Sequence, residues 1–127
     1  MTPAGPKIYA AKKDRDNVGS TRLHGDVADA FNLCTHGEAI WIGFARKDAG
    51  KVNEFLLELS GNTVHQQLTF FTTSHLDDLF AKKGVKPFII HQHCGDMIIL
   101  PAGCLHQVTS YYLLMSQTCS FAFVRVY

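Results

Sequence analysis

The chain has 127 residues, 46% of them hydrophobic, and its 12 Lys and Arg side chains nearly balance its 11 Asp and Glu side chains. This length is typical of one domain with a buried core, and we expect residues 1–127 to form a single domain. A net charge near zero gives no signal for nucleic-acid binding. No apolar run approaches the roughly 20 residues that a membrane-spanning helix needs, so we expect a soluble chain.

The cysteine pattern is that of a reducing compartment. The four cysteines have no C-x-x-C spacing, and the first residues do not resemble a signal peptide; they are Cys34, Cys94, Cys104 and Cys119. We therefore expect reduced thiols in a cytosolic or nuclear protein.

The first third of the chain predicts short strands. Residues 1–18 hold two of the four prolines and a polar run of mixed charge, which predicts an irregular surface lead-in. From Thr21 the pattern becomes strand-like, with apolar segments at 30–34 and 39–44 around a turn at 36–38.

Two helices are predicted in the middle of the chain. The first follows Asp48 and ends at Gly61, with helical spacing of Val52, Phe55, Leu56 and Leu59. A strand is predicted over 67–72. The second helix begins at a capping box of Ser74 and Asp77 and ends at Gly84, with a buried stripe of Leu76, Leu79 and Phe80.

The last third of the chain returns to strands. Apolar runs at 87–92 and 97–100 flank a turn at 94–96, and the aromatic stretch 111–127 fits one or two buried strands. Many short strands with two packing helices indicate a mainly β fold, a jelly-roll or cupin-like barrel whose mouth commonly holds a ligand.

One histidine and one carboxylate suggest a metal site. Residues i and i+2 of a strand point to the same face, so His24 and Asp26 can offer ligand atoms to one point, and Gly25 adds no bulk between them. They would supply two of the three ligands of a 2-His-1-carboxylate facial triad, the ligand set of non-haem Fe(II) oxygenases. His106, after the break at Pro101, Ala102 and Gly103, is the candidate for the third.

Other residues favour structural roles. A zinc cluster of His91, His93 and Cys94 lacks a second ligand pair at a recognised spacing. Trp41 with Phe70 and Phe71 could form an aromatic cage for a methylammonium group, but core packing is the favoured interpretation. The remaining histidines are expected on the surface or in the core, namely His36, His65 and His75.

Several longer motifs resemble the JmjC domain of the lysine-specific demethylase 3 subfamily. The resemblance runs from about residue 5 to 108 and is carried by residues 5–9, 19–26, 29–32, 84–87, 95–104 and 106–108. The most specific parts are G-S-T-R-L-H-x-D at 19–26 and G-D-x-x-x-x-P-A-G-C-x-H-Q-V at 95–108.

The resemblance implies a double-stranded β-helix and an Fe(II)- and 2-oxoglutarate-dependent dioxygenase. Such an enzyme hydroxylates an N-methyl group on histone lysine and releases formaldehyde, which implies a methylated histone tail as partner and a nuclear location. By the same resemblance His24, Asp26 and His106 would bind iron. Thr21 and Asn32 match the co-substrate pocket, where a hydroxyl can hydrogen-bond a carboxylate of 2-oxoglutarate.

One expected residue of the family pattern is absent. The subfamily implies a lysine about ten residues after the distal histidine, yet the chain has no Lys or Arg from there to Arg125, and Ala39 stands at the other family location. The resemblance also fades over 109–127. Three explanations fit. Arg125 supplies the cation from an unusual register, or the end of the chain is not the family's true terminus, or the chain is a catalytically impaired JmjC-like or cupin-like metal-binding module of a chromatin-associated protein.

Overall fold

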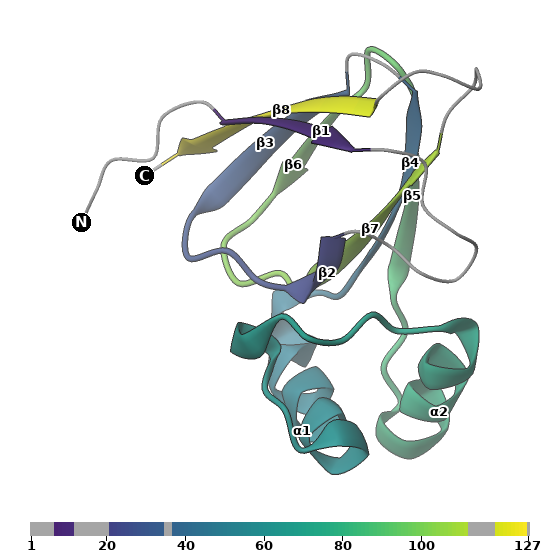
Figure 1. Ribbon diagram of the computed structural model, residues 1–127. Coiled ribbons are helices and arrows are strands. Elements are labelled where there is room, and N and C mark those ends of the chain that lie inside the picture. The colour runs from purple at the N-terminus through teal and green to yellow at the C-terminus, as the bar shows by residue number, and fades with distance from the viewer. Residues whose placement is uncertain (1–6, 12–20, 35–36, 112–118, 127) are drawn as a thin grey trace.

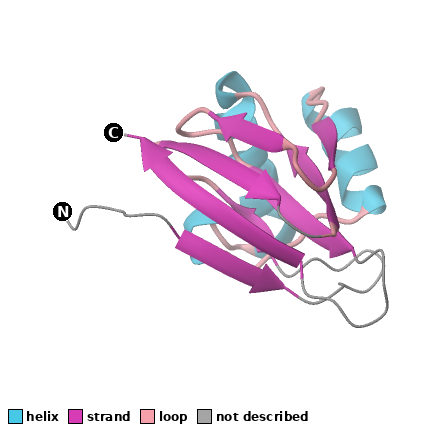
Figure 2. Ribbon diagram, turned by 90° about the horizontal axis from the view of Figure 1, so that it is seen from above, coloured by secondary structure: helices cyan, strands magenta, loops and turns pink. Residues whose placement is uncertain are grey.

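The computed structural model describes residues 7–11, 21–34, 37–111 and 119–126. Their strands form two four-stranded antiparallel sheets that face each other (Figures 1 and 2). In spatial order, the first sheet holds β1 (Lys7–Ala11), β8 (Cys119–Val126), β3 (Asp29–Cys34) and β6 (Met97–Leu100). The second holds β2 (Thr21–His24), β7 (His106–Tyr111), β4 (Glu38–Gly43) and β5 (Phe88–Gln92). This arrangement confirms the predicted mainly β jelly roll.

The first strand corrects the prediction of an irregular lead-in. Lys7–Ala11 pairs antiparallel with β8, and Lys7 faces Phe123 while Ala11 faces Cys119. The prolines before residue 7 and the polar run after residue 11 obscured this strand, because the segment between them is only five residues long. Its hydrogen-bond partner also lies more than 100 positions away. The rest of the predicted lead-in lies outside the described residues.

Alternating burial sets the interior of the barrel. Ala30, Asn32 and Cys34 are the buried positions of β3, and every second residue of β4 is buried in the same way. Since strand side chains alternate between faces, these residues point between the sheets. Three of them, Cys34, Ala39 and Trp41, form one apolar cluster with the buried residues Ile98, Leu100 and Val108.

The helices α1 (Ala49–Ser60) and α2 (Thr73–Lys83) confirm the two predicted packing helices and lie together beyond one end of the sheets (Figure 1). They enclose a second apolar cluster, which also contains residues of β2 and the loop before β7; its members are Leu23, Phe44, Val52, Phe55, Leu56, Val64, Phe71, Leu79, Val85 and Leu105. Both helices end where predicted, at Gly61 and Gly84, each in the left-handed conformation that glycine adopts without strain.

Each of the two helices buries fewer of its apolar residues than the helical spacing predicted. Leu59 is 42% exposed and Phe80 is 50% exposed. Both follow the helical period, but Leu59 lies in the last turn of α1, beyond the packed residues Phe55 and Leu56. Phe80 instead lies beneath the Lys86 ammonium, 5.1 Å from its ring centre.

The N-terminus of α2 corrects the predicted capping box. Thr72, not Ser74, caps the helix: its Oγ1 accepts from the His75 backbone N–H at 3.3 Å, and its own N–H donates to His75 Nδ1 at 3.1 Å. The sequence rule looks for Glu or Gln at the third helical position. A histidine plays that part here.

Residues 67–72 do not form the predicted strand. A 3-10 turn (Val64–Gln66) and a left-handed residue at Gln67 break the extended path. The segment still runs beside the second sheet, because the Gln107 side chain both accepts from the Phe71 N–H at 2.7 Å and donates to the Phe71 carbonyl at 2.8 Å. This side-chain amide, with one backbone bond from the Leu23 N–H to the Thr69 carbonyl at 2.9 Å, takes the place of a strand ladder.

The strand region predicted at 111–127 contains β8, whereas β7 meets it only at Tyr111, and residues 112–118 lie outside the described part. Within the described residues, neither helix has the length and apolar character needed to cross a membrane.

Candidate metal centre

Three side chains that sequence spacing singled out come together at one end of the barrel. His24 closes β2 and faces His106, the first residue of β7, in the strand register. One ligand atom each from His24, Asp26 and His106 lies within 4.8 Å of the other two. Over the described residues, this is the only group of three or more metal-ligating side chains close enough to share an ion.

The helix cluster explains why both histidines point inward. Leu23 and Leu105 directly precede His24 and His106, and both are buried against the helices. Because neighbouring residues of an extended chain point to opposite sides, fixing each leucine in the helix cluster turns the next side chain toward the barrel interior. The two helices thus orient the site without contributing a ligand.

Asp26 reaches the site by a different route from the one predicted. Strand β2 ends at His24, so the carboxylate is presented by the following loop and not by strand alternation. The Gly103 N–H donates to the Asp26 carbonyl at 2.9 Å, and the Ala102 N–H donates to the Asp29 carboxylate at 2.6 Å. These bonds join the loop after β2 and the first residue of β3 to the turn before β7.

Both histidines have a defined protonation pattern. Nδ1 of His24 lies 2.8 Å from the Arg22 carbonyl, and Nδ1 of His106 lies 2.9 Å from the Cys104 carbonyl. A carbonyl oxygen only accepts, so each Nδ1 must carry the proton. In the neutral imidazoles Nε2 then holds a lone pair. Metal-binding histidines commonly have this arrangement, in which the second ring nitrogen donates to a carbonyl.

The electrostatics of His106 favour the neutral form that a metal requires. Burial lowers the pKa of His106, and the nearby His24 lowers it further, against weaker opposing effects of the Cys104 carbonyl and Asp26. The His24 and His106 ring centres are 4.3 Å apart, and His106 Nε2 lies 3.9 Å from Asp26 Oδ2. Two imidazole lone pairs beside a carboxylate are a donor set that fits a divalent cation.

Thr21 also faces the barrel interior, for a reason the sequence does not reveal. It pairs with Val108, whereas His24 pairs with His106, so β2 has one more residue than β7 over this stretch. A β-bulge accounts for the difference and lets residues three apart share a face. Paired residues lie on one face, so Thr21 shares the interior face with the buried Val108.

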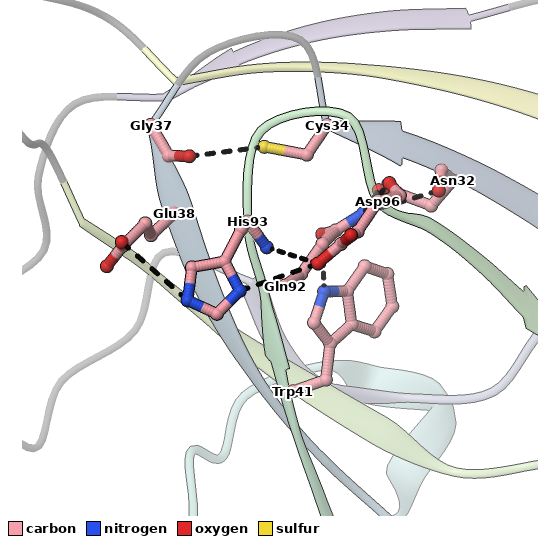
Figure 3. A network of polar contacts seen from close by, with 8 residues as sticks. All are labelled: Asn32, Cys34, Gly37, Glu38, Trp41, Gln92, His93 and Asp96. Atoms are coloured by element: carbon pink, nitrogen blue, oxygen red, sulfur yellow. Dashed lines mark hydrogen bonds and ion pairs between the residues drawn. The ribbon is translucent and has the colours of Figure 1, made fainter.

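Asn32 is buried in a chain of amide contacts (Figure 3). It is 1% exposed, and its Oδ1 accepts from Gln92 Nε2 at 2.8 Å. Gln92 Oε1 in turn accepts from the Trp41 indole N–H at 2.8 Å. Among the side chains described, Asn32 Nδ2 is the one buried polar atom without a hydrogen-bond partner. Such a donor costs about 1–3 kcal/mol, so the site has an unused hydrogen bond to offer.

The described residues also test the two alternative sites considered from sequence, the aromatic cage and the zinc cluster. Trp41 and Phe71 are fully buried, which confirms core packing for these two residues, whereas Phe70 is partly buried. His91, His93 and Cys94 are exposed and hold no metal-capable cluster in the described part of the chain. His93 instead lies between the carboxylates of Glu38 and Asp96, at 3.8 and 3.5 Å (Figure 3).

Gln92 is the site residue that sequence reasoning missed. Its amide reaches from the second sheet to β3 in the first. A signal was present: Phe88, Ile90 and Gln92 occur at a period of two, which places Gln92 on the apolar face of a strand. A buried amide must find polar partners, and this requirement predicts a role for it.

Fold and site together define a cupin-like jelly-roll protein with a His-Asp-His cluster suited to a metal ion. The chain belongs to the JmjC domain family, described as a hydroxylase domain, which matches residues 17–121. It is 28% identical to lysine-specific demethylase 3A of Rattus norvegicus over 85% of this chain and 13% of the relative. It is 30% identical to lysine-specific demethylase JMJ29 of Arabidopsis thaliana over 82% of this chain and 20% of that protein. The chain thus spans a fifth or less of these relatives.

Proposed function

We propose that this chain is an Fe(II)- and 2-oxoglutarate-dependent dioxygenase domain that demethylates N-methyl-lysine in histones. The observation that carries the proposal is the cluster of His24, Asp26 and His106, in which the Nδ1 atom of each histidine is committed to a backbone carbonyl. Two imidazoles and one carboxylate are the donor set that non-haem Fe(II) oxygenases use.

In this proposal the site residues bind either the metal ion or the co-substrate. His24, Asp26 and His106 would hold Fe(II). When bound, the ion and 2-oxoglutarate would activate dioxygen, so that one oxygen atom converts an N-methyl group to a hydroxymethyl group, which leaves as formaldehyde, and the other enters succinate as 2-oxoglutarate loses carbon dioxide. Thr21, with a hydroxyl on the interior face, and Asn32, with its buried donor, would hydrogen-bond the co-substrate.

The proposed substrate is a methylated histone tail, and the proposed location is the nucleus. Both follow from the resemblance of residues 5–108 to the lysine-specific demethylase 3 subfamily. The names of the relatives support lysine-specific demethylation alone. The chain's net charge near zero fits recognition of a peptide by local contacts better than bulk attraction to nucleic acid.

The second carboxylate of 2-oxoglutarate needs a cation, because an unpaired buried charge is costly. The sequence has no Lys or Arg between Gln107 and Arg125. In the register of β3 with β8, Ala30 faces Arg125 and Asn32 faces Phe123. Position 125 therefore shares a sheet face with the buried Ala30, and we propose Arg125 as the cation.

The role of Arg125 is tested by binding of 2-oxoglutarate to the Mn(II)-loaded protein. We expect Arg125→Gln to weaken 2-oxoglutarate binding by roughly tenfold or more, since hydrogen bonds to charged groups are the stronger ones, with Mn(II) binding unchanged. Arg125→Lys should retain part of the affinity. Full affinity in Arg125→Gln would contradict this assignment.

The same shortage of cations favours one alternative, a catalytically impaired JmjC-like metal-binding module in a chromatin-associated protein. Turnover separates the two proposals. The purified chain, supplied with Fe(II), 2-oxoglutarate and a histone H3 peptide carrying methyl-lysine, should form succinate and formaldehyde in equal amounts. His24→Ala should abolish both products. Metal binding without either product would favour the module.

A further inference from the structure

The orientation of the Asn32 amide is set by residues outside the metal cluster. Trp41 Nε1 can only donate a hydrogen bond, so the Gln92 atom 2.8 Å away must be the carbonyl oxygen Oε1. The other end of the Gln92 amide is then Nε2, which can only donate. The atom that faces it at 2.8 Å must be Asn32 Oδ1.

These donors and acceptors allow only one orientation of the Asn32 side-chain amide. With Oδ1 committed to Gln92, the Nδ2 donor is turned away from Gln92, buried and without a partner among the described side chains. Both amide orientations therefore follow from a single fixed point, the indole N–H of Trp41.

Gln92 is itself held firmly. Its Nε2 also lies 3.3 Å from the Asn32 carbonyl and 3.1 Å from the Asp96 carbonyl, so it contacts both the side chain and the backbone of β3 and the turn before β6. Gln92 is 1% exposed. Rotation of its amide would place Oε1 against acceptor oxygens and Nε2 against the indole donor, and would break all four contacts.

The same chain of contacts reaches the metal cluster. The Trp41 ring stacks on the His106 ring, with centres 5.5 Å apart and planes 27° apart. Trp41 is completely buried. One rigid side chain thus contacts a proposed iron ligand with its ring face and sets the Gln92 amide with its edge.

We propose that Gln92, oriented by Trp41, is a positioning residue that presents Asn32 Nδ2 as a hydrogen-bond donor to a carboxylate ligand beside the metal cluster. This inference rests on the proposed function, in which that ligand is 2-oxoglutarate. Gln92 acts only through Asn32. Its loss lets the Asn32 amide turn and present an acceptor where the donor is needed.

The test is a double-mutant cycle on 2-oxoglutarate affinity. Gln92→Met keeps the length of the side chain and removes its polar contacts, and Asn32→Ala removes the proposed donor. With Mn(II)-loaded protein in a calorimeter, we expect Gln92→Met to weaken 2-oxoglutarate binding roughly tenfold and to leave Mn(II) affinity within about twofold. In the Asn32→Ala background, Gln92→Met should have no further effect.

Two controls separate positioning from damage to the fold. His91→Met changes the neighbouring exposed residue of β5 and should match the wild type. Trp41 is the only tryptophan, so its single indole N–H resonance reports directly on the Gln92 contact. In metal-free Gln92→Met this resonance should move while the methyl resonances of the core stay dispersed.

Each outcome decides between the two proposals. Wild-type affinity in Gln92→Met, or an equal loss with and without Asn32, would overturn the positioning role and leave the proposed function intact. Failure of the Mn(II)-loaded wild type to bind 2-oxoglutarate would overturn both.

Discussion

At the scale of single residues, hydrogen bonds from Nδ1 to backbone carbonyls do as much for the site as the choice of residue type. They make Nδ1 the donor in His24 and in His106, so that in the neutral imidazole the lone pair is on Nε2, beside Asp26. Burial lowers the pKa of His106 and keeps that lone pair available. The negative charge that attracts a cation comes from Asp26.

Asp26→Asn isolates that charge, because it preserves the size and shape of the side chain. We expect metal affinity to fall by at least the roughly 10–100-fold that loss of an outer partner of a metal ligand costs, since a ligand and a charge are lost together. Calorimetric titration with Mn(II) measures the effect. Asp48→Asn, at the start of α1, is the matched control and should bind as the wild type does. Equal affinity in both variants would argue against the site.

At the scale of elements, the sequence predicted whether a segment is helix or strand better than it predicted which distant segments contact each other. Both helices, their glycine ends and most strands follow from periodicity, which is a local property. The strand Lys7–Ala11 was missed, and residues 67–72 were mistaken for a strand. In both cases the deciding partner is distant: Lys7–Ala11 pairs with β8, and Gln107 binds Phe71.

The cap of α2 tests the corrected helix start. Thr72→Ala removes the hydroxyl that accepts from the His75 N–H, and we expect it to lower the free energy of unfolding by about 1 kcal/mol. Ser74→Ala should change it by no more than about 0.5 kcal/mol, as for an ordinary surface substitution. Urea unfolding of the two variants measures the difference. A larger loss of unfolding free energy in Ser74→Ala than in Thr72→Ala would support the capping box expected from sequence.

The link between the two loops at the site predicts an effect of Asp29, which is no ligand itself. Its carboxylate accepts from the Ala102 N–H across 73 positions of sequence. Asp29→Ala frees the turn before His106, and we expect Mn(II) affinity to fall roughly tenfold, at the low end for outer partners. Asp77→Ala, on the exposed side of α2, is the control for loss of a carboxylate. An unchanged Mn(II) affinity in Asp29→Ala would show that the turn before His106 keeps its position without the hydrogen bond to Asp29.

At the scale of the whole molecule, the site depends on closing the barrel. His24 and His106 come from opposite ends of the chain and meet only because β2 pairs with β7. Sequence motifs predicted which residues would meet, since residue types carry the chemistry. They did not predict the bulge at Thr21, the loop that carries Asp26 or the amide chain behind Asn32, because these depend on strand register and on contacts between the two sheets.

Metal stoichiometry tests the central claim most directly. Titration of the purified, metal-free chain with Fe(II) under anaerobic conditions should reach one ion per chain, and binding should be lost in His106→Ala and kept in His91→Ala, which changes an exposed histidine. Binding of Fe(II) that persists in His106→Ala, or the absence of binding in the folded wild type, would contradict the account.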